Sequence, residues 1–331
     1  DLAAQIGSVR VGERRVLSLI EEFGSEVVLE AVEVILNSAE QQARDVISTW
    51  PDGIYKGEAV LDDDGHGRTD VTIRATVTKK ASDIIVDLTD SDLQSDGFLN
   101  SSYANMRSAV AMAISYLINP ETPKNHGSQR PITVRAKQGT IVWSNDGAPV
   151  TMCTSHCSNE ICEAIIVALS QACPERATGG WGRRFRVAIQ GENPKTGKEF
   201  IWHLFHARPG AGGSSEGDGW HNAGEWHSAG GLKFGSVELA EARFPLLFDK
   251  HEFRKNSAGD GQFRGGAGVE LELEMETQTA ALANTAGDGN RHGSRGMVGG
   301  QDSKPHHYEL HGQDGSVREL KTKEISVPVR P

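Results

Sequence analysis

Hydrophobic positions recur every three to four residues along the first 48 residues of the chain, which is the spacing of an amphipathic helix. Gly24 interrupts this pattern and Ser25, a suitable N-cap, follows it, so the sequence predicts helices over residues 1–23 and 25–48. We expect residues 1–50 to form a helical hairpin that packs against a larger body. The chain begins with Asp1 inside the first helical pattern and without a start signal, which favours a preceding region of polypeptide.

Alternation with a period of two replaces the helical spacing after residue 53 and is clearest at residues 71–78, which we expect to pair with 83–89 as a hairpin. Helical spacing returns at 103–118 and 159–171. The other strand-like segments are 131–144, 184–190, 200–206, 246–254, 268–276 and parts of 307–328, with a short helix near 237–242. This order predicts an α+β fold with mixed, mostly antiparallel sheets, comprising an α/β region over 51–180 and a β-rich region over 181–331.

Glycine is unusually abundant, with 38 of 331 residues against a usual share of about 7%. Many glycines lie in a loop over residues 209–235, and we expect this loop to line a site, the alternative being a packed Ω-loop. The loop and its start hold the candidate site residues. We predict His221 and His227 as catalytic bases near neutral pH. We predict Arg208, Glu216 and Asp218 as substrate-binding residues, with Arg208 holding a carboxylate or phosphate group.

Other motifs give weaker signals. The four cysteines lie within residues 153–173 and form no CxxC pair, so a structural zinc site is disfavoured and free thiols are expected. Acidic runs at 62–64 and 87–92 could hold a hard cation, although such runs are more often solvated turns. Glycine-rich strings at 260–268 and 287–293 lack the complete dinucleotide or Walker pattern, so no nucleotide site is expected within this chain.

The balance of charged residues limits the kinds of partner that the chain is suited to bind. The chain has 34 Lys and Arg against 45 Asp and Glu, a formal net charge of −11. Such a chain is poorly suited to binding nucleic acid or an anionic membrane. The sequence also contains no apolar run of about 18 residues and no signal peptide, so we expect no membrane association and a cytoplasmic location.

Five segments, taken in order, resemble the hydantoinase B/oxoprolinase family over nearly all of the chain. Residues 5–17 match the family's Gln-x-x-x-x-x-x-Gly-x-x-Arg-x-Leu helix, and residues 125–132 stand where the family has an Asn-x-Gly-x-x-Arg-Pro stretch. The acidic stretch with its following Gln, Gly and Asn (87–100) and the element at 237–245 also match. The string Ser-Ala-Gly-Asp-Gly-Gln-Phe-Arg-Gly-Gly-Ala-Gly, within 249–268, is similar to the family's most recognisable signature.

The resemblance implies a hetero-oligomer with a hydantoinase A-type partner that binds ATP. In such relatives ATP phosphorylates an amide or enol oxygen; hydantoinases and oxoprolinases then hydrolyse the activated lactam, whereas acetone and acetophenone carboxylases join a ketone enolate to activated bicarbonate. It further implies a divalent metal (Zn, Mn or Mg), held by a motif that lies upstream of residue 1. Departures from the family pattern at 153–160 and 225–235 leave the substrate open.

Three functional hypotheses follow from the sequence. The first is a subunit of an ATP-dependent hydrolase of cyclic amides such as hydantoin, 5-oxoproline or another lactam. The second is a subunit of an ATP-dependent ketone carboxylase. The third is a non-catalytic structural subunit, which the lack of a metal motif favours and the composition of the glycine loop opposes.

Overall fold

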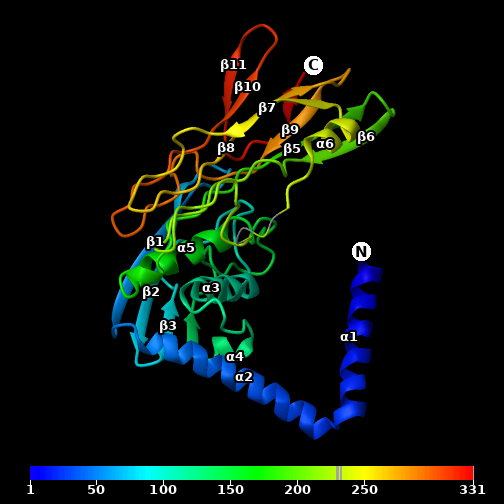
Figure 1. The fold of residues 1–331 in the computed structure, drawn as a ribbon. Helices are drawn as coiled ribbons and strands as arrows, with labels where there is room; N and C mark the ends of the chain where they lie inside the picture. The colour runs from blue at the N-terminus through cyan, green and yellow to red at the C-terminus, as the bar shows by residue number, and fades with distance from the viewer. Residues whose placement is uncertain (229–230, 232, 331) are drawn as a thin grey trace.

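Two long helices, α1 (Leu2–Phe23) and α2 (Ser25–Ser48), begin the chain in the computed structural model, which describes residues 1–228, 231 and 233–330. Both form where the hydrophobic spacing predicts them. They diverge at Gly24, whose φ of 84° places it in the left-handed region, and they do not lie along one another (Figure 1). No residue of α1 is buried, whereas α2 buries Ala39, Ala43 and Ile47 at its C-terminal end.

A four-stranded sheet follows, in the order β1-β2-β3-β4. Its strands are β1 (Gly53–Asp63), β2 (Thr69–Lys80), β3 (Asp83–Asp87) and β4 (Ile132–Arg135). The first three pair antiparallel, and β4 pairs parallel with β3. The helix α5 (Cys157–Leu169) packs against β1 and β2, and α3 (Tyr103–Leu117) packs against α5. The short helix α4 (His126–Gln129) packs against α2.

The close packing of α5 on the sheet depends on Gly57 in β1. A Cβ atom at this position would lie 2.2 Å from the carbonyl oxygen of Ala164. The apolar side chains on either side of this contact form one hydrophobic core, which extends from Ile47 to Cys173 and also includes Trp226. The glycine loop is therefore anchored by its second tryptophan in the core of the preceding region.

The rest of the chain is rich in β structure. One antiparallel sheet has the order β12-β9-β5-β6, made of β5 (Val187–Asn193), β6 (Lys198–His203), β9 (Ala281–Thr285) and β12 (Val327–Val329). Two separate hairpins complete this part: β7 (Leu246–Phe253) with β8 (Val269–Met275), and β10 (Tyr308–His311) with β11 (Val317–Leu320). The helix α6 (Val237–Arg243) precedes β7, and a second hydrophobic core lies among these elements.

The mixed, mostly antiparallel α+β fold that the sequence predicts is confirmed, with differences at particular elements. The strand predicted over 131–144 ends at Arg135, because a turn with Gly139 at a φ of 88° follows it. The strand β9 and the helix α4 are additions that the sequence pattern does not predict. Residues 229, 230 and 232 of the predicted glycine loop lie outside the described residues.

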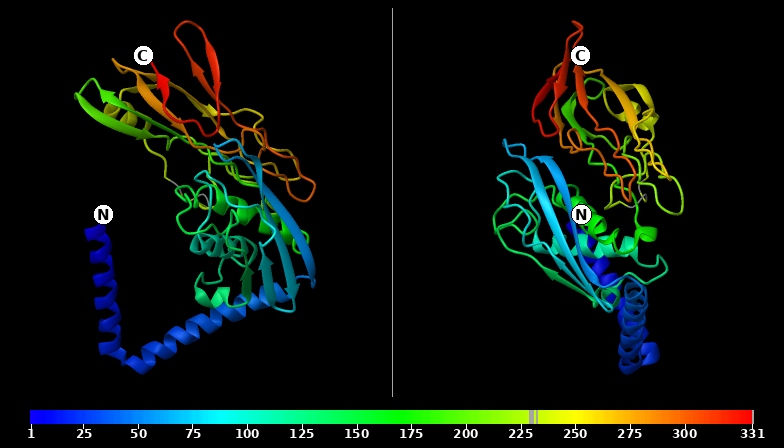
Figure 2. Two further views of the ribbon diagram at one scale, coloured as in Figure 1. Left: turned by 180° about the vertical axis from the view of Figure 1, so that it is seen from behind. Right: turned by 90° about the vertical axis from the view of Figure 1, so that its left-hand side faces the viewer.

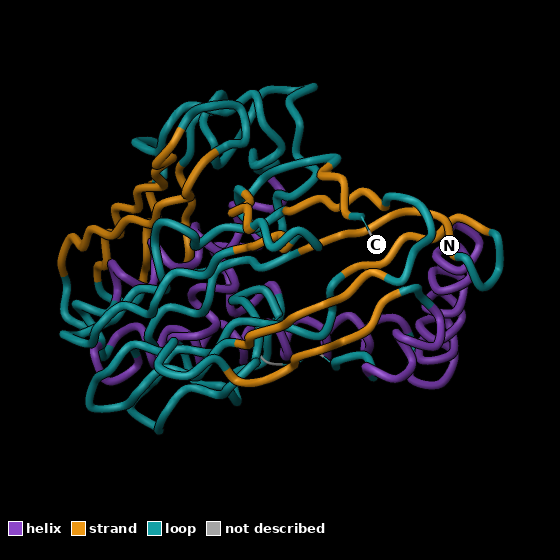
Figure 3. Tube along the Cα trace, turned by 90° about the horizontal axis from the view of Figure 1, so that it is seen from above, coloured by secondary structure: helices purple, strands orange, loops and turns teal. Residues whose placement is uncertain are grey.

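Long irregular segments lie where the β-rich part meets the first sheet (Figures 2 and 3). They include parts of 177–186, 204–235, 254–268 and 286–307. Hydrogen bonds between distant residues, such as Asp62 with Gly289, connect the two parts there. Among the described residues, no helix combines the length and the apolar character needed to cross a membrane.

Candidate functional site

The glycine loop is packed tightly against a second glycine-rich segment, residues 257–268. A Cβ atom on Gly210 would lie 2.0 Å from the carbonyl oxygen of Gly266, and a Cβ atom on Gly266 would lie 2.0 Å from that of Trp220. Backbone hydrogen bonds join the two segments, for example from the Gly266 N–H to the Ala211 carbonyl at 2.8 Å. These glycines therefore permit two backbones to approach each other, as in a packed loop.

One side of this packed loop borders a cavity of about 1220 Å³. Apolar side chains of β5 and β8 line part of the cavity, and the backbone of the glycine segments lines another part. Phe185 stacks on Tyr308 in its wall, with ring centroids 4.6 Å apart, and His306 contacts both rings. Burial lowers the pKa of His306 to about 3, so this imidazole is neutral at pH 7. Arg208 also belongs to the lining.

The extended segment before β5 directs basic side chains in two directions, as expected from the alternation of an extended chain. Arg183 reaches into the α5 region and bonds Glu160 at 2.8 Å and Glu163 at 3.0 Å. All three side chains are buried. Burial raises the pKa of Glu160 to about 8, the carboxylates of Asp288 and Glu163 raise it further, and Arg183 lowers it. At pH 7 this triad therefore holds a proton on Glu160.

Arg184 points to a different carboxylate, Glu225 of the glycine loop. The Arg184 Nη1 to Glu225 Oε1 distance is 2.8 Å, and the Arg208 Nη1 to Glu225 Oε1 distance is 3.7 Å. Glu225 is 0% exposed, Arg208 4% and Arg184 7%. Burial and the neighbouring Arg184 lower the pKa of Arg208, while Glu225 raises it. Arg186 belongs to the same group, because the charges of Arg184 and Arg208 affect it. Burial lowers the pKa of Arg186, and these two arginines lower it further.

Phe205 provides an aromatic surface beside these arginines. The guanidinium carbons of Arg186 and Arg208 lie 5.9 and 5.4 Å from the centre of its ring. Arg186 also contacts His203, with 3.2 Å between Arg186 Nη2 and His203 Nδ1. Arg184, Arg186 and Arg208, with Phe205 and Glu225, are called the arginine cluster below.

His227 lies next to the arginine cluster. Its backbone N–H donates to Asn159 Oδ1 at 3.0 Å, and its Nδ1 lies 3.2 Å from the same oxygen. Since an amide oxygen only accepts hydrogen bonds, this contact favours the tautomer with the proton on Nδ1 and leaves Nε2 as an acceptor. His227 is exposed as a whole residue, but desolvation of its ring lowers its pKa; Glu225 raises the pKa, and Arg184 and Arg208 lower it further. The imidazole is therefore neutral at pH 7.

The other predicted site residues are His221, Asp218 and Glu216. Among the described residues, none of them contacts the arginine cluster or His227. The Ala267 N–H donates to His221 Nδ1 at 2.9 Å, and the Arg264 N–H donates to Asp218 Oδ1 at 2.8 Å. Both side chains thus fasten the glycine loop to the second glycine segment. Glu216 is exposed on a turn of the loop.

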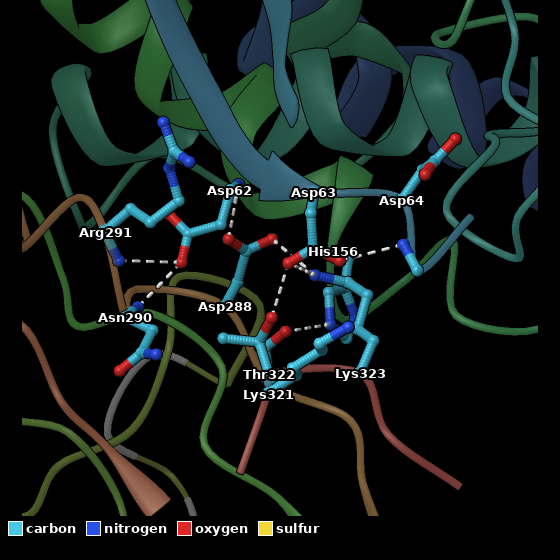
Figure 4. Close-up of polar contacts among 12 residues, drawn as sticks. Asp62, Asp63, Asp64, His156, Asp288, Asn290, Arg291, Lys321, Thr322 and Lys323 are labelled. Carbon is cyan, nitrogen blue, oxygen red and sulfur yellow. Dashed lines mark hydrogen bonds and ion pairs between the residues drawn. The ribbon is translucent and has the colours of Figure 1, made fainter. Parts of the chain in front are cut away.

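A second buried polar cluster joins the first sheet to the β-rich part (Figure 4). The Asp62 carboxylate at the end of β1 accepts backbone N–H bonds from residues 289–292 at 2.7–3.2 Å. Asp288 lies beside it, and Lys323 Nζ is 3.5 Å from Asp288 Oδ2 and 3.7 Å from Asp63 Oδ2. Burial raises the pKa of Asp288, and Lys323 lowers it. The glycine string 287–293 therefore encloses a carboxylate of this same chain.

The residues present do not fit the divalent metal that the resemblance implies. No three His, Cys, Asp or Glu side chains converge as a metal site in the part of the chain that the structure describes. Asp62 and Asp63 make the contacts described above, and Asp64 accepts hydrogen bonds from the backbone of His66 and Arg68 and from the Ser95 hydroxyl. Asp92 pairs with Arg68 and Arg74. The cysteines are free thiols, and burial raises the pKa of Cys173 to about 12.

Comparison with known proteins places the fold and these motifs in one class. A family model for hydantoinase B/oxoprolinase matches residues 1–331. The chain belongs to the hydantoinase B/oxoprolinase family.

Its relatives include the beta chain of caprolactamase from Pseudomonas jessenii, 32% identical over 82% of this chain and 47% of that protein. The B-type chain of a putative D-/L-hydantoinase from Pseudomonas sp. (strain NS671) is 29% identical over 91% of this chain and 52% of its own length. The chain spans about half the length of these curated relatives.

Solved structures show the same fold. The crystal structure of ATP-dependent caprolactamase from Pseudomonas jessenii superposes with a TM-score of 0.87 and 27% identity, covering 100% of this chain and 58% of that one. Nucleotide-free acetone carboxylase superposes with a TM-score of 0.77 over 90% of this chain and 42% of that one. At 19% identity, that likeness shows the fold alone.

Proposed function

We propose that this chain is part of a subunit of an ATP-dependent hydrolase of cyclic amides. The observation that carries this proposal is the superposition of the whole chain on the caprolactamase structure with a TM-score of 0.87. Both curated relatives are named as one kind of subunit, which supports a multi-subunit enzyme. In the reaction, the lactam C–N bond is broken, water supplies the new carboxylate oxygen, and ATP becomes ADP and phosphate.

Within this enzyme, His227 acts as the general base that accepts a proton from the attacking water. Two observations support this role: its Nδ1 is held by Asn159, and its lowered pKa keeps the ring neutral at pH 7. Arg208, beside it, binds the anionic part of the substrate or intermediate. His221 and Asp218 keep the glycine loop in place, and Glu216 lies at the loop surface, where it meets the substrate or the partner protein.

ATP is bound by a hydantoinase A-type partner in this proposal, within a cytoplasmic hetero-oligomer. A divalent metal would be held by polypeptide outside residues 1–331. Since the described residues do not form a ligand set for it, the steps assigned to this chain are substrate binding and proton transfer only.

The test is substrate-stimulated ATP hydrolysis by the complete assembly, measured with hydantoins, lactams and ketones, each with and without bicarbonate. Stimulation by a lactam without bicarbonate, with the ring-opened amino acid as product, is the expected result. A strict requirement for bicarbonate together with a ketone would overturn the hydrolase proposal and favour the ketone carboxylase. Full turnover by an assembly with both His221→Ala and His227→Ala would overturn the role of the loop and favour a purely structural role for this chain.

A further inference from the structure

We propose that the arginine cluster is an oxyanion-binding site that takes the carboxylate or phosphate group of a small molecule beside His227. This inference specifies the ligand class of the site proposed above. It rests on the proposed function only for the origin of the oxyanion, because a lactam hydrolase forms both a phosphorylated intermediate and a carboxylate product.

The first argument is an excess of positive charge. Arg184 and Arg208 pair with the single carboxylate of Glu225, whereas Arg186 has no ion pair among the described residues. Each of the three arginines stays protonated at neutral pH. The cluster therefore holds two more positive than negative charges, although the chain as a whole has a net charge of −11. Like charges at close range repel in a partly buried setting, so such an arrangement gains stability when an anion enters.

The second argument is the set of N–H groups that remain available. In the described part of the chain, Arg184 Nε and Arg208 Nε and Nη1 are buried and have no hydrogen-bond partner. A buried donor without a partner costs about 1–3 kcal/mol. A fork of N–H groups matches the two oxygens of a carboxylate or phosphate, which makes these donors suited to an oxyanion.

The third argument is access. Arg186 is only partly buried, and Phe205 is 47% exposed, so this side of the cluster is open to a ligand. Arg208 in addition belongs to the lining of the large cavity. An oxyanion bound to Arg186 and Arg208 would lie over or beside the Phe205 ring, which also accommodates the apolar part of a small molecule.

The triad around Arg183 differs from the arginine cluster in its charge, although Arg183 Nε is also buried without a hydrogen-bond partner among the described residues. There, one guanidinium bonds two carboxylates, and the charge excess is negative and relieved by a proton on Glu160. In the arginine cluster the imbalance has the opposite sign, and guanidinium groups cannot relieve it by losing a proton. An anionic ligand would balance it.

The experiment is calorimetric titration of the complete assembly with inorganic phosphate and, separately, with γ-aminobutyrate, at constant ionic strength maintained with chloride. Arg186→Gln is the main variant because this side chain is partly exposed. Arg208→Lys is the second variant, which keeps the charge but loses the fork. Arg135→Gln on β4 is the control, because Arg135 is exposed and its guanidinium has no ion pair among the described residues.

We expect at least one of the two anions to bind, with binding weakened about 10-fold or more in Arg186→Gln and Arg208→Lys, and unchanged in Arg135→Gln. Tighter binding of phosphate would assign the site to the phosphorylated intermediate, and tighter binding of γ-aminobutyrate would assign it to the product carboxylate. The proposal is overturned if neither anion binds, if both variants bind like the wild type, or if Arg135→Gln loses as much. Arginine-dependent binding without lactam turnover would refute the hydrolase proposal alone.

Discussion

Replacing Asp62 by alanine is the sharpest test of how the two parts of the chain are held together. Asp62 is 1% exposed, and its Oδ2 accepts N–H bonds from Gly289, Asn290 and Arg291 at 2.8, 2.7 and 3.0 Å. Its Oδ1 accepts a fourth, from His292, at 3.2 Å. Alanine removes all four bonds together.

The expected loss of stability in Asp62→Ala depends on how many of these N–H donors water can reach. Gly289 is buried but keeps a 3.2 Å bond to Asp288, whereas Arg291 is exposed and can be rehydrated. Each buried donor left without a partner costs about 1–3 kcal/mol, and removing one member of a buried charged network costs about 3–5 kcal/mol. We therefore expect Asp62→Ala to lower the free energy of unfolding by about 3–5 kcal/mol.

Asp62→Asn separates the contribution of the hydrogen bonds to stability from that of the negative charge. An asparagine carbonyl in the place of Oδ2 retains the acceptor for three of the N–H groups, so we expect a loss of about 1–2 kcal/mol. Asp90→Ala is the control, because Asp90 is exposed and surface changes stay within about 0.5 kcal/mol. The assay is urea unfolding followed by tryptophan fluorescence, with Trp226 in the first core and Trp202 in the second. A loss below about 1 kcal/mol for alanine, or equal losses for both variants, would refute the reasoning.

Three further changes test other parts of the structure. The pKa of Glu160 in the folded state is raised from 4.5 to about 8, so the contribution of Glu160 to stability is lost as the pH rises through that range. In urea unfolding measured across this pH range, Glu160→Gln should flatten the decline of stability with pH. An unchanged pH slope would contradict the shared proton beside Arg183. His227→Ala should lower lactam turnover about 100-fold without loss of fold. The acid limb of the wild-type pH–rate profile should lie below pH 6.5, because the base must be deprotonated and the pKa of His227 is lowered. An acid limb above pH 6.5 would exclude His227 as the base. Gly266→Ala should destabilise the loops by at least about 2 kcal/mol, because the added Cβ meets the Trp220 carbonyl oxygen at 2.0 Å; wild-type resistance to limited proteolysis would contradict this packing.

Local hydrophobic spacing is sufficient to predict the helices and most of the strands. The second helix has the predicted bounds, and the predicted short helix near 237–242 forms at Val237–Arg243. Such periodicity depends only on which face of an element is buried. The strand β9 escapes prediction because it is short and leads into the glycine string that begins at Gly287, so it shows little alternation.

The polar contacts cannot be predicted in the same way, because they join residues far apart in the sequence. Asp62 bonds a loop 227 residues later, and a single sequence gives no signal for that pairing. The glycines of the loop stand out in the sequence, but the same residues permit approach of a ligand or of another backbone. One further signal does lie in the sequence: Glu160 and Glu163 occur on a mostly apolar helix, where buried carboxylates require a cationic partner.

The balance of the buried charges supports the site proposed above. The Asp62 carboxylate accepts backbone N–H bonds, and Arg183 bonds two carboxylates, so neither of these clusters has an excess of positive charge. In the arginine cluster, two of the three guanidinium groups pair with one carboxylate, and a neutral histidine lies beside them. A positively charged, partly open group next to a proton acceptor is what binding an anion and activating water require. The excess of positive charge therefore supports the proposal of chemistry at His227 and Arg208 more specifically than the glycine content of the loop does.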